Sequence, residues 1–386
     1  MPLRRPSPPV AAILVVGIAI FADTLIYFLL VPLLPSLAAR FNLGPLEVGL
    51  LVWSYSAALL GSTLPLGSVL ERRGRRTPML WGLALLGATT LLFAFAESFP
   101  LLVAARILQG VAGTITWVTG MALLSDVTPP EQRGRAMGTV FAFANAGLVA
   151  GPPLSGWLIE AFGPRSPYVV AAGLVALDAA ARALLLEDPP RRPGVALGIR
   201  DLLKDATVRV LAGAMAMGAA ATTVLETVLP VHFGTTLGFR PGLIGLLFGL
   251  LAGGHMATSP LMGALSDRVG RRRVMTVGFI LAALLVPLAG WLKAALPFAV
   301  LMVALGLVVS LCISPVPPAM AAAVDARGSS SYAVVFAILN SAYGVGMLAG
   351  PILGTAIQAA FGLPLALAVL GLAFFAFLPL LRAVRT

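Results

Sequence analysis

Two acidic residues stand inside long apolar stretches of this sequence, where charge is costly. Asp23 lies in AIFADTLIYF and Glu226 lies in VLETVLP. An ionised carboxylate at the centre of a bilayer costs about 2.5–3.5 kcal/mol, so each acid is expected to face a cavity and to be paired or protonated. A carboxyl group that exchanges a proton in such a place could couple proton movement to another process. The alternative, for each acid, is a hydrogen bond that only stabilises packing.

Other titratable residues are open to a structural role. The Arg106 guanidinium cannot lose its charge and needs a carboxylate or a polar network, so an ion pair and a coupling role are both open. The four-residue spacing of Asp178 and Arg182 predicts an ion pair within one helix. His232 and His255 could titrate near neutral pH, although single histidines are more often packed or interfacial. No histidine, cysteine and acid cluster has metal-ligand spacing, so we expect neither a metal nor a cofactor.

The composition indicates that lipid is the solvent for most of the chain. Hydrophobic residues make up 59% and charged residues 11%, against about 25% charged in a soluble domain. The net charge of +11 would otherwise favour a nucleic-acid partner, but the cations lie in short segments between apolar runs and act as topology signals. The single cysteine, Cys312, excludes a disulfide framework.

Apolar length predicts an all-α membrane protein with twelve transmembrane helices in two six-helix bundles. Each run reaches about 20 residues, enough to cross the hydrocarbon core as a helix. The polar segment 188–206 is expected to be a cytoplasmic linker between an N-terminal bundle (1–187) and a C-terminal bundle (207–386). The predicted spans are 10–37, 47–70, 77–96, 99–125, 136–161, 167–187, 207–235, 241–265, 274–292, 296–322, 331–359 and 362–382.

Lysine and arginine predict the orientation. With the N-terminus inside, 20 of the 26 fall in cytoplasmic segments, 4 fall outside, and Arg106 and Arg182 fall within spans. This bias places both termini in the cytoplasm.

The sequence contains an internal duplication. Residues 67–76 (GSVLERRGRR) and 263–272 (GALSDRVGRR) share one pattern, 196 positions apart. GLVAGPPLSG (147–156) is matched by VGMLAGPILG (345–354), and Asp126 is matched by Asp325. Two parallel repeats facing each other across a central path are typical of a secondary transporter.

The repeated motifs have mechanical interpretations. Acids and arginines of the basic turns could pair between the halves in one state and separate in another, as a latch, or serve only as topology signals. The latch set is Gly67, Glu71, Arg72, Gly74, Arg75, Gly263, Asp267, Arg268, Gly270 and Arg271. Glycines of the second motif let helices approach closely, while its prolines break the hydrogen-bond ladder. The packing set is Gly147, Gly151, Pro152, Gly156, Gly350 and Pro351.

With these motifs, the chain resembles the major facilitator superfamily. The basic turns, RILQG (106–110) and AGPPLSG (150–156) are similar to those of its twelve-helix drug–proton antiporters. Further stretches resemble the vesicular monoamine transporter branch: 21–35, 131–138, 151–163, 225–230 and 324–340. The resemblance implies that Asp23 helps to bind a cationic substrate, that Arg106 belongs to the transport machinery, and that the span 136–161 seals the cavity during exchange.

The chain departs from that branch at three positions. Asn340 and Ile313 fall where monoamine transporters carry acids, and Tyr55 replaces a lysine. Proton coupling is therefore expected to differ from theirs. Aromatic faces attract organic cations, and an aromatic and amide lining is expected from Tyr27, Trp53, Tyr55, Asn145, Asn340 and Tyr343, although each could instead pack against neighbouring helices.

These observations predict a proton-coupled antiporter that exports lipophilic or cationic small molecules, with multidrug or amine efflux as its role, by alternating access. We expect a monomer in a prokaryotic-type plasma membrane, with protons and a small molecule as partners and no nucleic acid. A facilitator or importer of a neutral solute such as a sugar is one alternative, and a non-transporting receptor or lipid scramblase is another. An enzyme is disfavoured because no nucleophile–base pair is visible.

Overall fold

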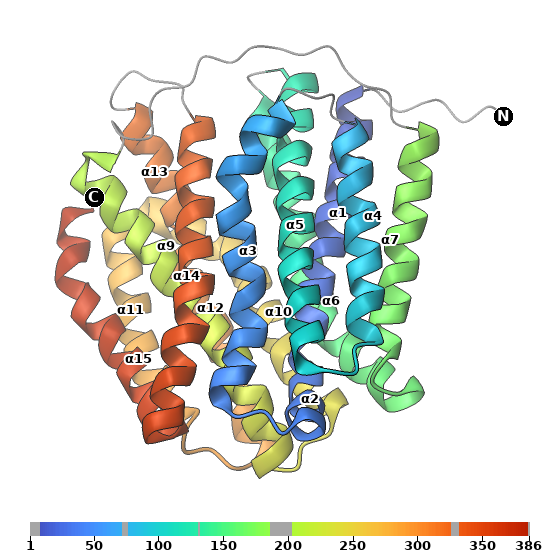
Figure 1. Cartoon of the computed structure of the whole chain (residues 1–386). Coiled ribbons are helices and arrows are strands. Elements are labelled where there is room, and N and C mark those ends of the chain that lie inside the picture. The colour runs from blue at the N-terminus through green and yellow to red at the C-terminus, as the bar shows by residue number, and fades with distance from the viewer. Residues whose placement is uncertain (1–7, 72–75, 130–131, 186–202, 326–331, 385–386) are drawn as a thin grey trace. The chain divides into compact units, whose positions relative to one another are not determined.

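The described part of the chain consists of helices joined by short turns. A computed structural model describes residues 8–71, 76–129, 132–185, 203–325 and 332–384, and these ranges contain no strand (Figure 1). The all-α prediction is confirmed. Long apolar runs without internal polar partners form helices because a helix satisfies its own backbone hydrogen bonds in lipid.

In the first half, the residues that the structure describes form eight helical elements. They are α1 (Pro8–Leu29), η1 (Val31–Leu33), α2 (Leu34–Phe41), α3 (Pro45–Glu71), α4 (Arg76–Ala94), α5 (Phe99–Val127), α6 (Arg133–Phe162) and α7 (Ser166–Leu185).

The second half repeats this order with short additions. Its elements are α9 (Ala206–Val231), η3 (His232–Thr236), α10 (Pro241–Val269), α11 (Arg271–Leu288), α12 (Ala295–Ile313), α13 (Val316–Asp325), α14 (Tyr332–Phe361), α15 (Leu363–Phe377) and η4 (Leu378–Ala383).

Four predicted spans are not continuous α-helices. The run 10–37 breaks after Leu29 into a 3-10 turn, and 207–235 ends in a π-helical turn from His232. The run 296–322 turns at Ser314 and Pro315, and 362–382 changes to a 3-10 helix at Leu378. Proline is the physical reason, because it has no amide hydrogen for the ladder and stands at or near each break. A long apolar run therefore predicted the span but not its interruption.

Nine helical stretches of the described chain are long and apolar enough to cross a bilayer. They are Ala12–Phe41, Arg76–Ala94, Phe99–Val127, Arg135–Phe162, Ala206–Thr236, Pro241–Val269, Ala295–Ala322, Ala337–Phe361 and Leu363–Ala383. The other predicted spans lie in α3, in α7 with its shorter apolar stretch Ser166–Ala180, and in α11, which begins with three arginines. Large side chains such as Trp291 are 73% exposed, as expected of surfaces that face lipid.

The chain divides into two compact units. Unit 1 comprises Met1–Leu33 and Ser54–Pro193, and unit 2 comprises Leu34–Trp53 and Gly194–Thr386. The segment 34–53 thus packs with unit 2, where Gly49 lies against Thr355. Most of the predicted linker 188–206 lies outside the described residues, so its cytoplasmic location stays a prediction.

The first helix of each repeat packs closely on the glycine–proline helix of the same repeat. In unit 1 α1 packs on α6, and in unit 2 α9 packs on α14. A Cβ atom on Gly147 would lie 2.7 Å from the carbonyl oxygen of Phe21, and one on Gly350 would lie 2.6 Å from that of Ala220. Only glycine fits such contacts without a shift of backbone. In each unit, the helix that carries the buried acid is therefore packed at close range against the glycine–proline helix.

Candidate functional site

Asp23 lies at the centre of a hydrogen-bonded network in unit 1. Its side chain is 2% exposed on α1. The Tyr55 hydroxyl, from α3, lies 3.2 and 3.0 Å from its two carboxylate oxygens, and Trp117 Nε1, from α5, donates to Oδ2 at 3.0 Å. The structure thus unites three helices around one carboxyl group. Hydrogen bonds from donors of this kind favour its charged form.

Gly113 makes room for this network on α5. A Cβ atom at this position would lie 2.7 Å from the Tyr55 hydroxyl and 3.1 Å from Asp23 Oδ1. Trp117 follows one helical turn later, so α5 offers a gap for the carboxyl group and then a donor to it. Any larger residue at position 113 would displace the hydroxyl or the carboxylate.

Arg106 is enclosed between two tyrosines of unit 1. Its side chain is 0% exposed, and its Cζ lies 5.1 Å from the ring centroid of Tyr27 and 4.9 Å from that of Tyr55. One terminal nitrogen donates to Gln109 Oε1 at 3.1 Å, while Nε and the other terminal nitrogen find no partner in the described residues. Asp23 interacts with Arg106 electrostatically. The guanidinium charge is therefore stabilised by aromatic faces and a nearby carboxylate.

Glu226 of unit 2 has the opposite surroundings. Its side chain is 6% exposed on α9 and makes no hydrogen bond or ion pair within the described chain. Tyr343 of α14 interacts with it electrostatically. Pro230 has no amide hydrogen, so the Glu226 carbonyl oxygen lacks its usual helical donor. A charge without partners is expensive in such a place, and a bound proton removes that cost.

The remaining predicted lining residues are dispersed. Asn145 is partly exposed on α6, Trp53 is partly exposed in unit 2, and Asn340 is exposed on α14. The side chains of Asn145 and Asn340 make no hydrogen bond within the described residues. Tyr27 lies against Tyr55, with ring centroids 5.0 Å apart. The structure thus brings Tyr27, Tyr55, Asp23 and Arg106 together, but it gives the two amides no bond to either acid.

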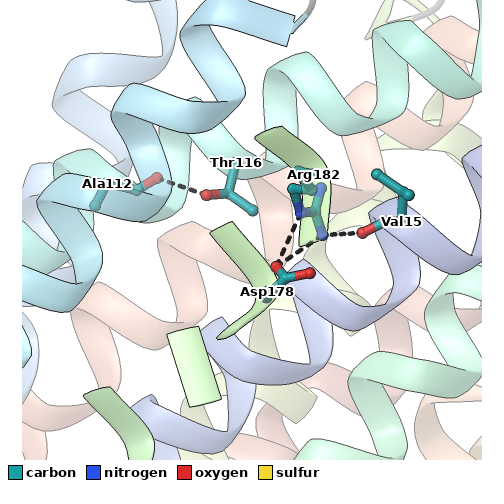
Figure 2. A network of polar contacts seen from close by, with 5 residues as sticks. All are labelled: Val15, Ala112, Thr116, Asp178 and Arg182. Atoms are coloured by element: carbon teal, nitrogen blue, oxygen red, sulfur yellow. Dashed lines mark hydrogen bonds and ion pairs between the residues drawn. The ribbon is translucent and has the colours of Figure 1, made fainter. Parts of the chain in front are cut away.

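The predicted pair of Asp178 and Arg182 is confirmed. Arg182 Nε and one terminal nitrogen lie 2.9 and 2.8 Å from Asp178 Oδ2, with both side chains almost fully buried. The same terminal nitrogen donates to the Val15 carbonyl oxygen (Figure 2). Figure 2 also shows the Thr116 hydroxyl turned toward the Ala112 carbonyl oxygen of its own helix. The ion pair therefore joins α7 to the α1 backbone and serves the packing of unit 1.

The second basic turn is described in full, whereas part of the first is not. Gly270 joins α10 to α11 with φ at +103°, a conformation that favours glycine. Arg271 donates to Asp267 Oδ1 at 3.3 Å across this exposed turn. Arg72, Gly74 and Arg75 lie outside the described residues, and the surroundings of Gly67 and of the Glu71 side chain are not described, so the latch stays a prediction.

With this geometry in hand, the comparisons with known proteins assign the family. A sequence model of the Major Facilitator Superfamily matches residues 16–221 and 210–386. The chain belongs to the major facilitator superfamily. It is therefore a membrane transporter, and its family consists of transporters rather than enzymes.

Similar members of the superfamily are amine transporters. The synaptic vesicular amine transporter of Rattus norvegicus is 29% identical over 343 residues, covering 88% of this chain and 67% of that protein. The chromaffin granule amine transporter of Homo sapiens is 31% identical over 347 residues, covering 88% and 65%. This chain spans about two thirds of the length of these relatives.

Solved structures support the major facilitator fold. A bacterial homologue of the human lysosomal transporter Spinster, inward-facing and occupied, gives a TM-score of 0.82 at 17% identity, covering 98% of each chain. Its unoccupied form gives 0.79 at 16% identity, covering 99% of this chain and 96% of that one. The predicted fold, two six-helix bundles of a major facilitator, is confirmed.

A repeated polar seam is a feature of this transporter that the sequence analysis missed. In unit 1 Ser62 donates to Thr114 at 2.8 Å, and in unit 2 Thr258 and Ser310 lie 2.8 Å apart. Thr258 and Ser310 follow Ser62 and Thr114 by 196 positions, the spacing of the basic turns. We use the name seam for these two hydroxyl contacts and for the helix–helix contact around each of them. Extending the spacing of the basic turns along each repeat would have found it.

The seam includes a close backbone approach in both units. Gly110 lies against the main chain of Tyr55, and Gly306, 196 positions later, lies against the main chain of Leu251 and His255. Thr114 donates to the Leu59 carbonyl oxygen and Ser310 to the His255 carbonyl oxygen, each at 2.9 Å. α3 and α5 of unit 1 are therefore joined in the same way as α10 and α12 of unit 2.

Proposed function

We propose that this transporter is a proton-coupled antiporter, which exchanges protons for a lipophilic organic cation by alternating access. The observation that supports this proposal is the contrast between the two buried acids. Asp23 is surrounded by donors, whereas Glu226 has none within the described chain. One acid is built to hold negative charge and the other to hold a proton, which are the two functions that an antiporter of cations requires.

Asp23 is assigned to the cation. Tyr55 and Trp117 stabilise and orient its carboxylate, and the charge compensates that of Arg106. An ammonium group that enters can share this carboxylate, and the faces of Tyr27 and Trp117 offer it further attraction. The similarity to amine transporters supports the same class of substrate.

Glu226 is assigned to the proton. Because no described group pairs with this buried carboxyl group, a bound proton stabilises it, and the proton leaves when water or a cation arrives. Substrate and proton then weaken each other's binding reciprocally, as linkage requires. The prediction that Asp23 and Glu226 face one path joins the two units and belongs to this proposal.

Several further predictions complete the proposal. Both termini lie in the cytoplasm, because lysine and arginine are concentrated in the segments assigned to that side. The transporter acts as a monomer in a plasma membrane. The basic turns act as the latch between conformations, and the close contacts of Gly147 and Gly350 let α6 and α14 close the cavity on their partner helices.

The test is proton movement in liposomes that contain the purified full chain. With an imposed pH gradient, a panel of monoamines and lipophilic cationic dyes is added, and internal pH is recorded. We expect some members to cause proton release, which is lost in Asp23→Asn and Glu226→Gln. The matched control is Glu97→Gln, the same chemical change at an exposed acid, which should retain the signal.

The opposite result is well defined. Silence across the panel, with neutral solutes equilibrating regardless of pH, would favour the facilitator and reduce both acids to packing residues. Proton release that survives both substitutions would leave an antiporter but contradict the site.

A further inference from the structure

The helix α11 begins with three arginines, and the third has no counterpart in unit 1. Arg271 and Arg272 belong to the repeated basic turn, whereas Arg273 stands 196 positions after Thr77 of α4, the corresponding helix. Arginines at the end of a membrane span act as topology signals, and those that the two turns share already supply this signal. Arg273 is therefore an additional cation, which the repeat does not explain.

Most arginine side chains of this turn are unpaired within the part of the chain that the structure describes. Arg271 lies 3.3 Å from Asp267. The side chains of Arg268, Arg272 and Arg273 make no hydrogen bond or ion pair with described residues. The first turn of α11 contains no acid, and its N-cap glycine gives no side-chain cap. Cations at the positive end of a helix are unfavourable unless an anion compensates them.

Positive charge dominates the surroundings of this turn in unit 2. α11 packs on α10, α12, α15 and η4. In η4, Arg382 is exposed, and the adjacent Leu381 lies in the same buried cluster as Met275 near the start of α11. Asp267 is the one acid in these five described helices, which gives them a net charge of +4. Their five arginines are Arg268, Arg271, Arg272, Arg273 and Arg382.

An exposed aliphatic stripe follows Arg273 along one face of α11. Val277, Ile280, Leu284 and Leu288 come four, seven, eleven and fifteen residues later, and all four side chains are exposed. At 3.6 residues per turn, these positions and Arg273 fall within about 80° of the helix circumference. In a membrane transporter such a stripe faces acyl chains. This face thus presents a guanidinium group and then aliphatic side chains, which is the order of groups that a phospholipid can contact.

We infer that this face of α11 is a binding surface for an anionic phospholipid, whose phosphate contacts Arg273 and the adjacent Arg272. One acyl chain then lies along Val277, Ile280 and Leu284. Phosphatidylcholine carries the same phosphate with a compensating cation, so the arginines should favour phosphatidylglycerol, which has a net negative charge. The surface is independent of the proposed antiport and of its substrate.

Two lipids that differ in their headgroup test this surface. The full chain in detergent is titrated with dioctanoyl phosphatidylglycerol and dioctanoyl phosphatidylcholine, and native mass spectrometry counts the bound lipid. We expect wild type to prefer phosphatidylglycerol, and Arg273→Thr to lower this preference about fivefold, the effect of one arginine at an anionic lipid surface. Threonine is the residue that α4 carries at this position, so the variant is expected to fold.

The matched control is Arg240→Thr. Arg240 is exposed at the opposite end of α10 and makes no side-chain cap bond there. The control removes the same charge from unit 2 at a distance from the basic turn, and it should keep the wild-type preference.

Two further measurements distinguish a lipid from a free anion. Ile280→Asn places a polar group on the stripe and should weaken the binding of both lipids about fourfold or more, because at least one methylene contact is lost. The preference between the two lipids should remain. Inorganic phosphate in excess should not displace phosphatidylglycerol, because it makes no contact with the stripe.

Each other outcome overturns the inference. Equal binding of the two lipids to wild type, or an unchanged preference in Arg273→Thr, rejects the surface. The same loss in Arg240→Thr reduces the effect to the overall charge of the protein. Displacement by inorganic phosphate, with no effect of Ile280→Asn, assigns the arginines to a free anion. All of these results leave the antiporter standing, since proton movement tests it separately.

Discussion

Asp23 and Glu226 occupy the first helix of their respective repeats, and the two acids are stabilised in opposite ways. Asp23 has donors from α3 and α5 and an arginine nearby, whereas Glu226 is buried without a hydrogen bond or ion pair in the described chain. The two repeats thus share a scaffold and differ in the charge that each can hold. Duplication accounts for the shared helices, and later divergence accounts for the different surroundings of the two acids.

The largest effect is expected at a third acid, which is fully paired. Asp178→Ala leaves the buried Arg182 guanidinium uncompensated and should lower the free energy of unfolding by about 3–5 kcal/mol. Glu226→Gln, which breaks no described bond, should lower it by less than about 1 kcal/mol. Denaturant unfolding in detergent measures both. Equal losses would show that Glu226 is held by a partner after all.

Substrate binding should separate Asp23 from Glu226 next. Asp23→Asn removes the charge that an ammonium group pairs with and should weaken tyramine binding about thirtyfold or more. Glu226→Gln, which imitates the protonated acid, should keep equilibrium binding near the value that wild type shows at low pH and abolish the dependence of binding on pH. Binding of labelled tyramine to detergent-purified protein provides the measurement, and a reversed order would exchange the two assignments.

A smaller effect is expected from the donors to Asp23. Tyr55→Phe removes one hydrogen bond to the carboxylate and should weaken tyramine binding about tenfold, as for a bond to a charged group. Tyr343→Phe is the matched control near Glu226, since no hydrogen bond joins these two residues in the described structure. A loss as large in Tyr343→Phe would remove the contrast between the two sites.

The smallest effect concerns the feature that the units share. Thr114→Ala and Ser310→Ala each remove one seam contact and should each lower the free energy of unfolding by about 1 kcal/mol. Similar losses in the two units would support a repeated joint. A loss in only one of them would mean that the seam has a structural role in that unit alone.

Much of the fold could be predicted from sequence because membrane spans are set by length and hydropathy. The apolar runs and the two basic turns predicted the helices and their duplication, and the family comparison confirmed the fold. The breaks at Leu29 and Ser314 were missed, since a proline within an apolar run does not reveal whether the helix ends there.

The charged residues of the candidate site could be predicted because they lie within apolar runs. Asp23 and Arg106 are conspicuous in apolar runs, and the structure places them in one network. Gly113 makes room between α1, α3 and α5, and no local pattern encodes that contact. Gln109 follows Arg106 by three residues on the same helix, so the sequence alone could have suggested their bond. The seam was within reach, because its residues repeat at the spacing of the basic turns.

The turn at Ser314 and Pro315 divides one span of unit 2 into two helices, α12 and α13. α12 packs on both α10 and α9, and α13 packs on α9 and α14. Pro315, Pro317 and Pro318 cannot complete the ladder across the joint, so bending there breaks no backbone hydrogen bonds that a continuous helix would have to give up. α13 can therefore change its angle to α12 at this joint, while α9, which carries Glu226, keeps its contacts with both of them.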